Sequence, residues 1–288
     1  MDAGNREREW LGRDPDRARA EEQRAAAARA RSEQARLARE AEEAAAGLAA
    51  YRDVNWRARL ARAWLVIVAA LSVLTATLEI AHLRLVAGKT TGTLTLDLAQ
   101  RVDDSNATLG VVYILTLVAY LFSAVFFILW THRAYKNITA LGAQRPRFGA
   151  GWAIGGWFVP ILGLWRPKQV VDDIWRASDP AAPAAVRPDQ WRNQRTPFLL
   201  AAWWALYIAG SVADRLAARQ PSDTIEHDRM ATTYALCSSL LTIAGALLAV
   251  LVVTRVTGRQ RARAEAVGAT GAAALSGSPP TAATARAT

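Results

Sequence analysis

Polar side chains recur at helical spacing within four otherwise apolar segments of this sequence, and they are the residues best placed to do chemistry. In the first two segments they follow the spacing i, i+3, i+7 and i+10, which puts each set on one face of a helix. If the four faces converge, they form a polar cavity that opens outward, with Glu79 as its central ionisable group and Arg215 as the partner of Glu79. The candidate residues are Ser72, Thr75, Glu79, His82, Tyr113, Thr116, Tyr120, Ser123, Tyr207, Ser211, Asp214, Arg215, Tyr234, Ser238 and Thr242.

A simpler interpretation of the same residues needs no cavity. Hydroxyl groups between helices in a membrane stabilise helix association by ~0.6 kcal/mol each. A carboxylate near the end of a span can also extend its side chain to the surface, and Glu79 is near such an end. The two interpretations differ in whether Glu79 faces the other polar stripes or faces solvent.

The rest of the sequence lacks the usual patterns of catalysis. A single Cys excludes a disulfide framework and a thiolate metal cluster, and the three His residues do not have zinc-site spacing. We find no phosphate loop, no Gly-x-Ser-x-Gly elbow and no dinucleotide fingerprint. We therefore expect a protein that is not an enzyme, with no catalytic residues, no cofactor and no metal.

Composition indicates the solvent in which these residues act. The chain of 288 residues is 52% hydrophobic, contains 11 Trp, and gathers its apolar residues into blocks. That distribution predicts an all-α, polytopic membrane protein. Four blocks are long enough to span the ~30 Å hydrocarbon core of a bilayer. The expected spans are 64–83, 110–130, 197–215 and 234–254, within a membrane domain over 51–260.

A fifth apolar stretch begins the segment 149–178, but it is too short for a crossing helix. Its apolar part contains Gly155, Gly156 and Pro160, which disfavour a straight helix. In the second half, Pro167 suits a first helical turn. There Val170, Val171, Ile174 and Trp175 form one stripe, with Asp172, Asp173 and Arg176 expected to face away. We predict a cytoplasmic re-entrant or interfacial element.

The distribution of Arg and Lys predicts the orientation of the spans. Basic residues gather before the first span, between the second and third spans, and after the fourth, whereas the other two connections have few. Because cytoplasmic loops carry an excess of basic residues, both termini should be cytoplasmic. The formal charge of +10 is spread around span ends, so we expect anionic lipid rather than nucleic acid as its partner.

The segment between the second and third spans also carries basic and aromatic residues suited to a headgroup region. Four basic residues flank its apolar part and are candidates for binding lipid headgroups: Arg145, Arg147, Arg166 and Lys168. The Trp residues around them predict an aromatic belt at the inner interface, formed by Trp64, Trp130, Trp152, Trp157, Trp165, Trp175 and Trp191. Simple membrane anchoring and a groove for a lipid headgroup or a protein partner are both open for this segment.

The stretch from His132 to Pro180 resembles the signature of the actinobacterial membrane family called domain of unknown function 4328. It reads "HRAYKNITALGAQRPRFGAGWAIGGWFVPILGLWRPKQVVDDIWRASDP", with Trp, Gly and Pro positions that match the family pattern. The resemblance implies four spans and no known activity. It marks an interfacial motif whose candidate residues are Arg133, Tyr135, Asn137, Trp152, Trp157, Pro160, Trp165, Pro167, Trp175 and Arg176.

The two ends of the chain differ from the membrane domain. Residues 1–50 are rich in Ala, Arg and Glu at i, i+4 spacing, which predicts a charged cytoplasmic helix. A solvated stalk and an alanine-lined helix that pairs as a coiled coil are both open. Residues 261–288 are rich in small and polar residues and predict a disordered tail.

Two classes of function follow from these observations. The first is a non-catalytic membrane protein that docks lipids or a protein partner. The alternative is a small transporter or channel, with an outward-facing polar cavity around Glu79. Neither the ligand nor the oligomeric state is indicated by the sequence.

Overall fold

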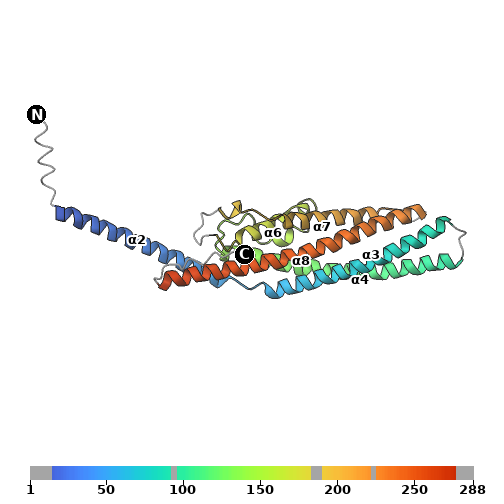
Figure 1. Ribbon diagram of the computed structural model, residues 1–288, viewed down its shortest axis with the longest axis horizontal. Helices are drawn as coiled ribbons and strands as arrows, with labels where there is room; N and C mark the ends of the chain where they lie inside the picture. Colours follow the sequence, from blue (N-terminus) through green and yellow to red (C-terminus); the bar gives the residue numbers. More distant parts are fainter. Residues whose placement is uncertain (1–14, 92–95, 183–189, 222–224, 277–288) are drawn as a thin grey trace, which may run out of the picture.

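The computed structural model describes residues 15–91, 96–182, 190–221 and 225–276, and all regular secondary structure in these ranges is helical (Figure 1). This confirms the predicted all-α class. The long helices are α2 (Pro15–Ala50), α3 (Asn55–Thr91), α4 (Leu96–Ala140), α7 (Phe198–Ala217) and α8 (Ile225–Ser276). The short elements are α5 (Trp152–Gly155), η1 (Leu162–Leu164), α6 (Arg166–Ala177) and η2 (Gln190–Asn193).

Three helices are long and apolar enough to cross a membrane, over Asn55–Ala87, Gln100–Ala140 and Glu226–Ala269. They contain the first, second and fourth predicted spans, and they indicate a membrane protein. The third predicted span coincides with α7, which has 20 residues and carries Asp214 and Arg215 in its last turn. Hydroxyl groups within these helices bond to the carbonyl four residues earlier, which satisfies them without water.

The bundle helices pack in the order α4, α3, α8, α7, and each runs antiparallel to the next (Figure 1). We call the end at which α3 ends and α4 begins the distal end, and the end nearer α2 the proximal end. The outer members, α4 and α7, do not pack against each other along their length. The bundle is therefore open on one side.

At the proximal end, the segment 149–178 fills this open side and contacts both α4 and α7. We call it the inserted segment. It contains helices of 4, 3 and 12 residues joined by turns, so it does not form a straight crossing helix, as predicted. Gly156 is required at its tightest point, because a Cβ there would lie 2.7 Å from the carbonyl oxygen of Trp152.

The environment of α6 differs in part from the prediction. Pro167 lies in the first turn of the helix, and Val170, Val171 and Ile174 are fully buried, as expected. Asp172 and Asp173, however, were expected to face away from the apolar stripe and are also buried. The reason is that α6 lies among α4, α5, α7 and η2 instead of lying with one face in water.

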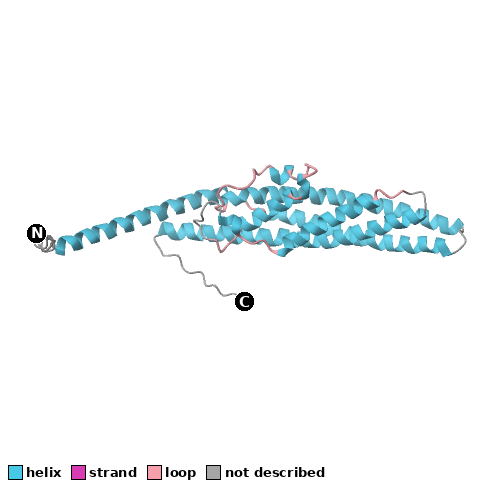
Figure 2. Cartoon of the chain, turned by 90° about the horizontal axis from the view of Figure 1, so that it is seen from above, coloured by secondary structure: helices cyan, strands magenta, loops and turns pink. Residues whose placement is uncertain are grey.

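The two ends of the chain are helical where the structure describes them. Helix α2 is largely exposed and extends away from the bundle, which agrees with the predicted charged helix (Figure 2). The tail predicted to begin at residue 261 is helical as far as Ser276, because α8 continues through it. Alanine-rich sequence extends an existing helix at little cost, and Gly268 packs against Leu48 of α2. Residues 277–288 lie outside the described ranges.

Candidate functional site

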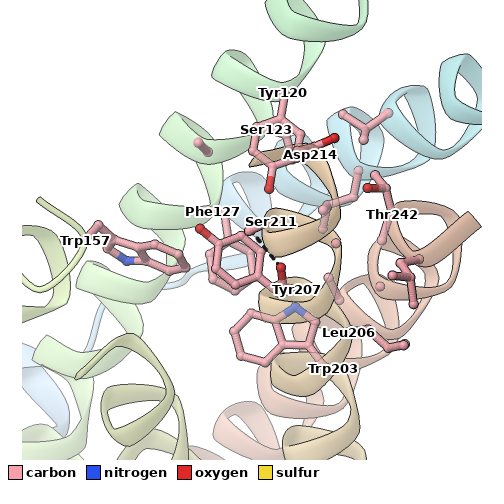
Figure 3. Close-up of a pocket in the computed structure, with 18 of the residues that line it drawn as sticks. Tyr120, Ser123, Phe127, Trp157, Trp203, Leu206, Tyr207, Ser211, Asp214 and Thr242 are labelled. Carbon is pink, nitrogen blue, oxygen red and sulfur yellow. Dashed lines mark hydrogen bonds between the residues drawn. The ribbon is translucent and has the colours of Figure 1, made fainter. Parts of the chain in front are cut away.

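A cavity of about 130 Å³ lies between α3, α4, α7 and α8, on the open side of the bundle (Figure 3). We call this cavity the groove. Its walls are mostly apolar and come from residues such as Leu65, Val68 and Leu206. The hydroxyl and carboxyl groups that line it belong to Tyr120, Ser123, Tyr207, Ser211, Asp214 and Thr242.

The proximal floor of the groove is a cluster of aromatic rings. Trp157 reaches it from the inserted segment, and its ring centroid lies 6.0 Å from that of Phe127 and 5.9 Å from that of Tyr207, both edge-on (Figure 3). Trp203 also packs on Phe127, with centroids 5.5 Å apart. Trp204 holds the inserted segment in place, because its indole N–H donates to the carbonyl of Leu164 at 2.8 Å. The inserted segment therefore closes the groove toward the proximal end.

The distal rim of the groove carries a carboxylate. Asp214 lies there beside Tyr120 and Ser123 (Figure 3). Within the described ranges, the Asp214 carboxylate has no Lys, Arg or His partner at ion-pair distance. The nearby Ser211 hydroxyl donates to the carbonyl of Tyr207 at 2.8 Å. The side chain of Arg215 donates to the backbone carbonyl of Ser211 at 3.1 Å. The rim therefore carries a carboxylate with which no cation of the described residues forms an ion pair.

The predicted polar residues divide between the groove and a helix interface. Tyr120, Tyr207, Asp214 and Thr242 line the groove, as do Ser123 and Ser211. The stripe of α3 does not join them, because α3 lies between α4 and α8 and turns its polar face toward those helices. The residues that lie away from the groove are Ser72, Thr75, Glu79, His82, Tyr113, Thr116, Arg215, Tyr234 and Ser238.

Glu79 faces another polar stripe, as the cavity interpretation expects, but it lies outside the groove. It does not line the groove, and its side chain is 0% exposed, so it does not reach the surface either. The Tyr113 hydroxyl donates to Glu79 Oε1 at 2.9 Å, and Ser239 also bonds this carboxyl. Arg215, its predicted partner, is exposed and donates to a backbone carbonyl. The acid that lines the groove is Asp214, and a functional role for Glu79 in a polar cavity stays a prediction.

The other stripe residues act within or between helices. Thr75 and Thr116 bond to carbonyls of their own helices, at 2.9 Å and 2.8 Å. Ser238 of α8 donates to the carbonyl of Gly210 of α7 at 3.2 Å, where the absence of a side chain lets the two helices approach. His82, 1% exposed, bonds to Ser105 of α4 and Asp228 of α8 at the distal end.

A junction of buried polar side chains joins α4, α8 and the chain before α3 at the proximal end. Asn137, which is fully buried, donates to the carbonyl of Arg52 at 2.8 Å and accepts from its N–H at 3.3 Å. Gln260 of α8 completes the junction, since it donates to the carbonyl of Ala134 at 2.8 Å and lies 3.5 Å from Asn137. The sequence did not single out Gln260, because a lone Gln in a basic stretch has no distinguishing pattern.

The neighbouring motif residues hold the inserted segment. The Tyr135 hydroxyl accepts from the N–H of Phe148 at 3.1 Å and donates to its carbonyl at 3.2 Å. His132 bonds to the carbonyl of Ala150 at 3.0 Å, and Arg133 donates to that of Ala50 at 3.4 Å. These contacts tie the inserted segment and the end of α2 to α4.

The predicted aromatic belt is only partly at the surface. Trp152 and Trp165 are exposed, as is Pro160 between them. Trp175 is half-buried, and Cζ of Arg259 lies 4.6 Å from the centroid of its ring. Trp130 and Trp191 belong to the core instead. Their indole N–H groups donate to the hydroxyl of Thr257 and to the carbonyl of Gln144, so that neither N–H is buried without a hydrogen-bond partner.

Most of the predicted headgroup-binding side chains have partners within the protein. Lys168 pairs with Asp172 at 2.7 Å, and Arg166 lies over the rings of Phe148 and Trp152, at 4.2 Å and 5.1 Å. Arg145 is exposed, with a left-handed backbone φ of 49°. A role in lipid binding stays a prediction for all four.

Arg147 and Arg176 flank the buried carboxyl of Asp173, at 3.3 Å and 3.9 Å. Burial raises the pKa of Asp173 to about 6, and the two guanidinium groups only partly oppose this effect. The contact between Arg147 and Asp173 joins the chain just before the inserted segment to α6 within it. It therefore helps to position the loop that carries Trp157.

Comparison with known proteins gives one match. A model of the family described as Domain of unknown function (DUF4328) matches residues 94–258. No curated protein and no solved structure matches the chain. The matched range contains α4, the inserted segment, α7 and α8 as far as Gly258, and therefore both the aromatic floor and Asp214.

Proposed function

The chain belongs to this family of unknown function, and we propose that it is a non-catalytic membrane protein that binds a small amphipathic cation in the groove. The observation that carries this proposal is the placement at one end of the groove of a carboxylate without an ion-pair partner among the described residues, and of an aromatic floor at the other end.

The dimensions of the groove indicate the size of the ligand. Asp214 lies seven residues beyond Tyr207 on α7, which corresponds to ~10 Å along the helix axis. A positively charged group beside Asp214 would neutralise that carboxylate, whose side chain is exposed at the rim. The apolar part of the same molecule would then lie on the rings of Tyr207, Trp203 and Phe127.

Exposed apolar side chains suggest how such a ligand enters. Ile114 and Leu117 of α4 and Phe158 of the inserted segment are 64%, 58% and 73% exposed, respectively, which suits contact with lipid. Since α4 and α7 do not pack along their length, the groove lies on the side of the bundle that lipid would cover. We propose that the ligand enters laterally from the bilayer.

Three probes of similar size test this proposal on the full-length protein in a non-ionic detergent. We expect benzyltrimethylammonium to raise the midpoint of thermal unfolding more than its neutral isostere neopentylbenzene, and toluenesulfonate to have no effect. Replacing Asp214 with Asn should lower the affinity for the cation by about tenfold or more and leave that for the neutral isostere unchanged. The exposed carboxylate of Glu226 provides a matched control, since Glu226→Gln should change neither affinity.

Either of two results would contradict the proposal. One is equal stabilisation by the cation and the anion. The other is a cation affinity that survives Asp214→Asn. Uptake of labelled benzyltrimethylammonium into proteoliposomes would instead support the alternative function, a transporter, which is favoured by the buried ionisable side chains of Glu79 and His82.

We also propose four spans, with α7 added to the three long apolar helices, and a bacterial plasma membrane location with the proximal end in the cytoplasm. The proximal end carries many more basic residues than the distal end, which supports this orientation. It also supports anionic lipid headgroups as partners of the exposed basic side chains, at about 1 kcal/mol each. Exposed proximal examples are Arg59, Lys136, Arg145, Arg195, Arg255 and Arg261.

Single-cysteine labelling in intact cells tests the orientation. With the exposed Cys237 replaced by Ser, cysteines at the exposed positions Gln144 and Ala181 should react only after the membrane is made permeable. A cysteine at the exposed distal position Asn106 should react in intact cells. Reaction of the Ala181 position from outside, with Gln144 protected, would show that the inserted segment crosses the membrane.

A further inference from the structure

Glu79 is the centre of a second polar site, which the groove does not explain. Its carboxyl lies where α3 packs between α4 and α8, and it is completely inaccessible to solvent. Tyr113 of α4 and Ser239 of α8 bond to it. Its second oxygen, Oε2, is buried and has no hydrogen-bond partner among the described residues.

The surroundings of Glu79 do not compensate a negative charge. Among the described residues, no Lys, Arg or His is within ion-pair distance of its carboxyl. Asp214 of α7 acts on Glu79 electrostatically and would repel a second negative charge. Because an isolated buried carboxylate costs far more free energy than a buried carboxylic acid, the surroundings suit the neutral, protonated form.

A second titratable residue lies one helical turn away, toward the distal end. His82 follows Glu79 at i+3 on α3, so the two side chains leave the same face of the helix. The Nε2 atom of His82 lies 3.1 Å from Asp228 Oδ2, and its Nδ1 atom lies 3.2 Å from the hydroxyl of Ser105. His82 is buried, whereas the side chain of Asp228 is 38% exposed. Asp228 and His82 therefore lead from the distal surface to the level of Glu79.

We propose that Glu79 is a proton-binding site, distinct from the groove, that exchanges its proton with the distal surface through His82 and Asp228. A proton from solvent binds Asp228 and passes to Nε2 of His82, and His82 releases its other proton from Nδ1 toward Glu79 Oε2. One water molecule between the two side chains completes the step. Imidazole suits this role, because it accepts a proton at one nitrogen and releases one at the other.

The Glu79 site lies outside the groove, but the two sites interact electrostatically. Glu79 senses the charge of Asp214 electrostatically. A cation bound at Asp214 would relieve the repulsion between these two acids and favour loss of the Glu79 proton. Proton release at Glu79 is therefore the expected companion of cation binding, although the proton site itself does not depend on the groove having a ligand.

The protonation of Glu79 is tested with the full-length protein in detergent at neutral pH. Infrared difference spectroscopy should show a carbonyl stretch of a protonated carboxylic acid that is absent from Glu79→Gln, a substitution that keeps an acceptor for Tyr113. Dicyclohexylcarbodiimide should label the same residue, since the O–H of a protonated acid adds across its C=N bond and rearrangement then gives a stable N-acylurea. If Glu79→Gln keeps both the carbonyl stretch and the carbodiimide label, the proposal is overturned.

The exchange route is tested by transferring the protein to deuterated buffer and following the shift of that carbonyl stretch. His82→Phe should slow the exchange by about a hundredfold, the scale of a well-placed acid–base group. Asp228→Asn, at a partly exposed position, should slow it as well and serves as the second variant if His82→Phe does not fold. Arg84→Gln, at an exposed position of α3, is the control and should leave the rate unchanged. Unaltered exchange in Asp228→Asn, or in a folded His82→Phe, would refute the route.

Discussion

Asn137→Leu is expected to lower the thermal midpoint of the protein by roughly 10 °C. The substitution preserves side-chain volume but removes the hydrogen bonds that Asn137 makes with both backbone groups of Arg52 and with Gln260. The loss amounts to about 3 kcal/mol, because each lost bond to a neutral partner costs ~1 kcal/mol. Gln260 is itself fully buried and cannot turn to water instead. Thermal unfolding in detergent measures the effect.

Asn193 provides the control for this prediction. It is exposed, so Asn193→Leu should leave the midpoint within a few degrees of the wild-type value. Gln260→Leu should resemble Asn137→Leu, and the double variant should lose less than the sum of the two, because both remove the same contact. Equal midpoints for Asn137→Leu and Asn193→Leu would show that the junction contributes little to stability.

Gly156→Ala is expected to abolish most ligand binding in the groove, with an affinity loss of about tenfold or more. The added Cβ would lie 2.7 Å from the carbonyl oxygen of Trp152 and 2.8 Å from Cγ of Arg166, so the backbone of the inserted segment must move. The next residue is Trp157, whose ring forms the groove floor against Phe127. Overpacking of this kind also costs about 1–3 kcal/mol of stability.

The preceding glycine, Gly155, provides a matched control for this experiment. A Cβ at Gly155 would meet no atom within 4 Å, so Gly155→Ala adds the same methyl group to the same segment without a clash. Titration with benzyltrimethylammonium should separate the two variants, with wild-type affinity for Gly155→Ala only. Wild-type affinity in both variants would show that the floor does not depend on the position of Trp157.

The proximal and distal halves of the bundle are built differently, and this difference places the groove. At the proximal end, the inserted segment fills the space between α4 and α7 and is held by Tyr135, His132 and Trp204. Toward the distal end nothing in the described ranges occupies that space, and the groove lies there. The polar side chains of Tyr120, Tyr207 and Asp214, which line the groove on this open side, are therefore accessible to a ligand.

The sequence by itself determined the properties that depend on neighbours along the chain. Uninterrupted apolar runs without Pro predict α3, α4 and α8, and the glycines and proline after residue 150 predict the break that the inserted segment shows. The alternation of Ala, Arg and Glu predicts α2. Family membership was also visible, in the pattern of Trp, Gly and Pro around the inserted segment.

Only the tertiary structure decided which polar groups share a site. Helical periodicity shows that Glu79 and Asp214 each lie on a polar face, but it contains no information about which helix that face meets. The packing order α4, α3, α8, α7 buries the stripe of α3 on two sides, and it leaves only Tyr120 and Ser123 of the α4 stripe, together with the stripe of α7, to line the groove. Asp173 was misjudged for the same reason, because its burial comes from the surrounding elements and not from the pattern of α6. Burial of a polar residue is a property of the neighbours that pack on it, and these neighbours are distant in sequence.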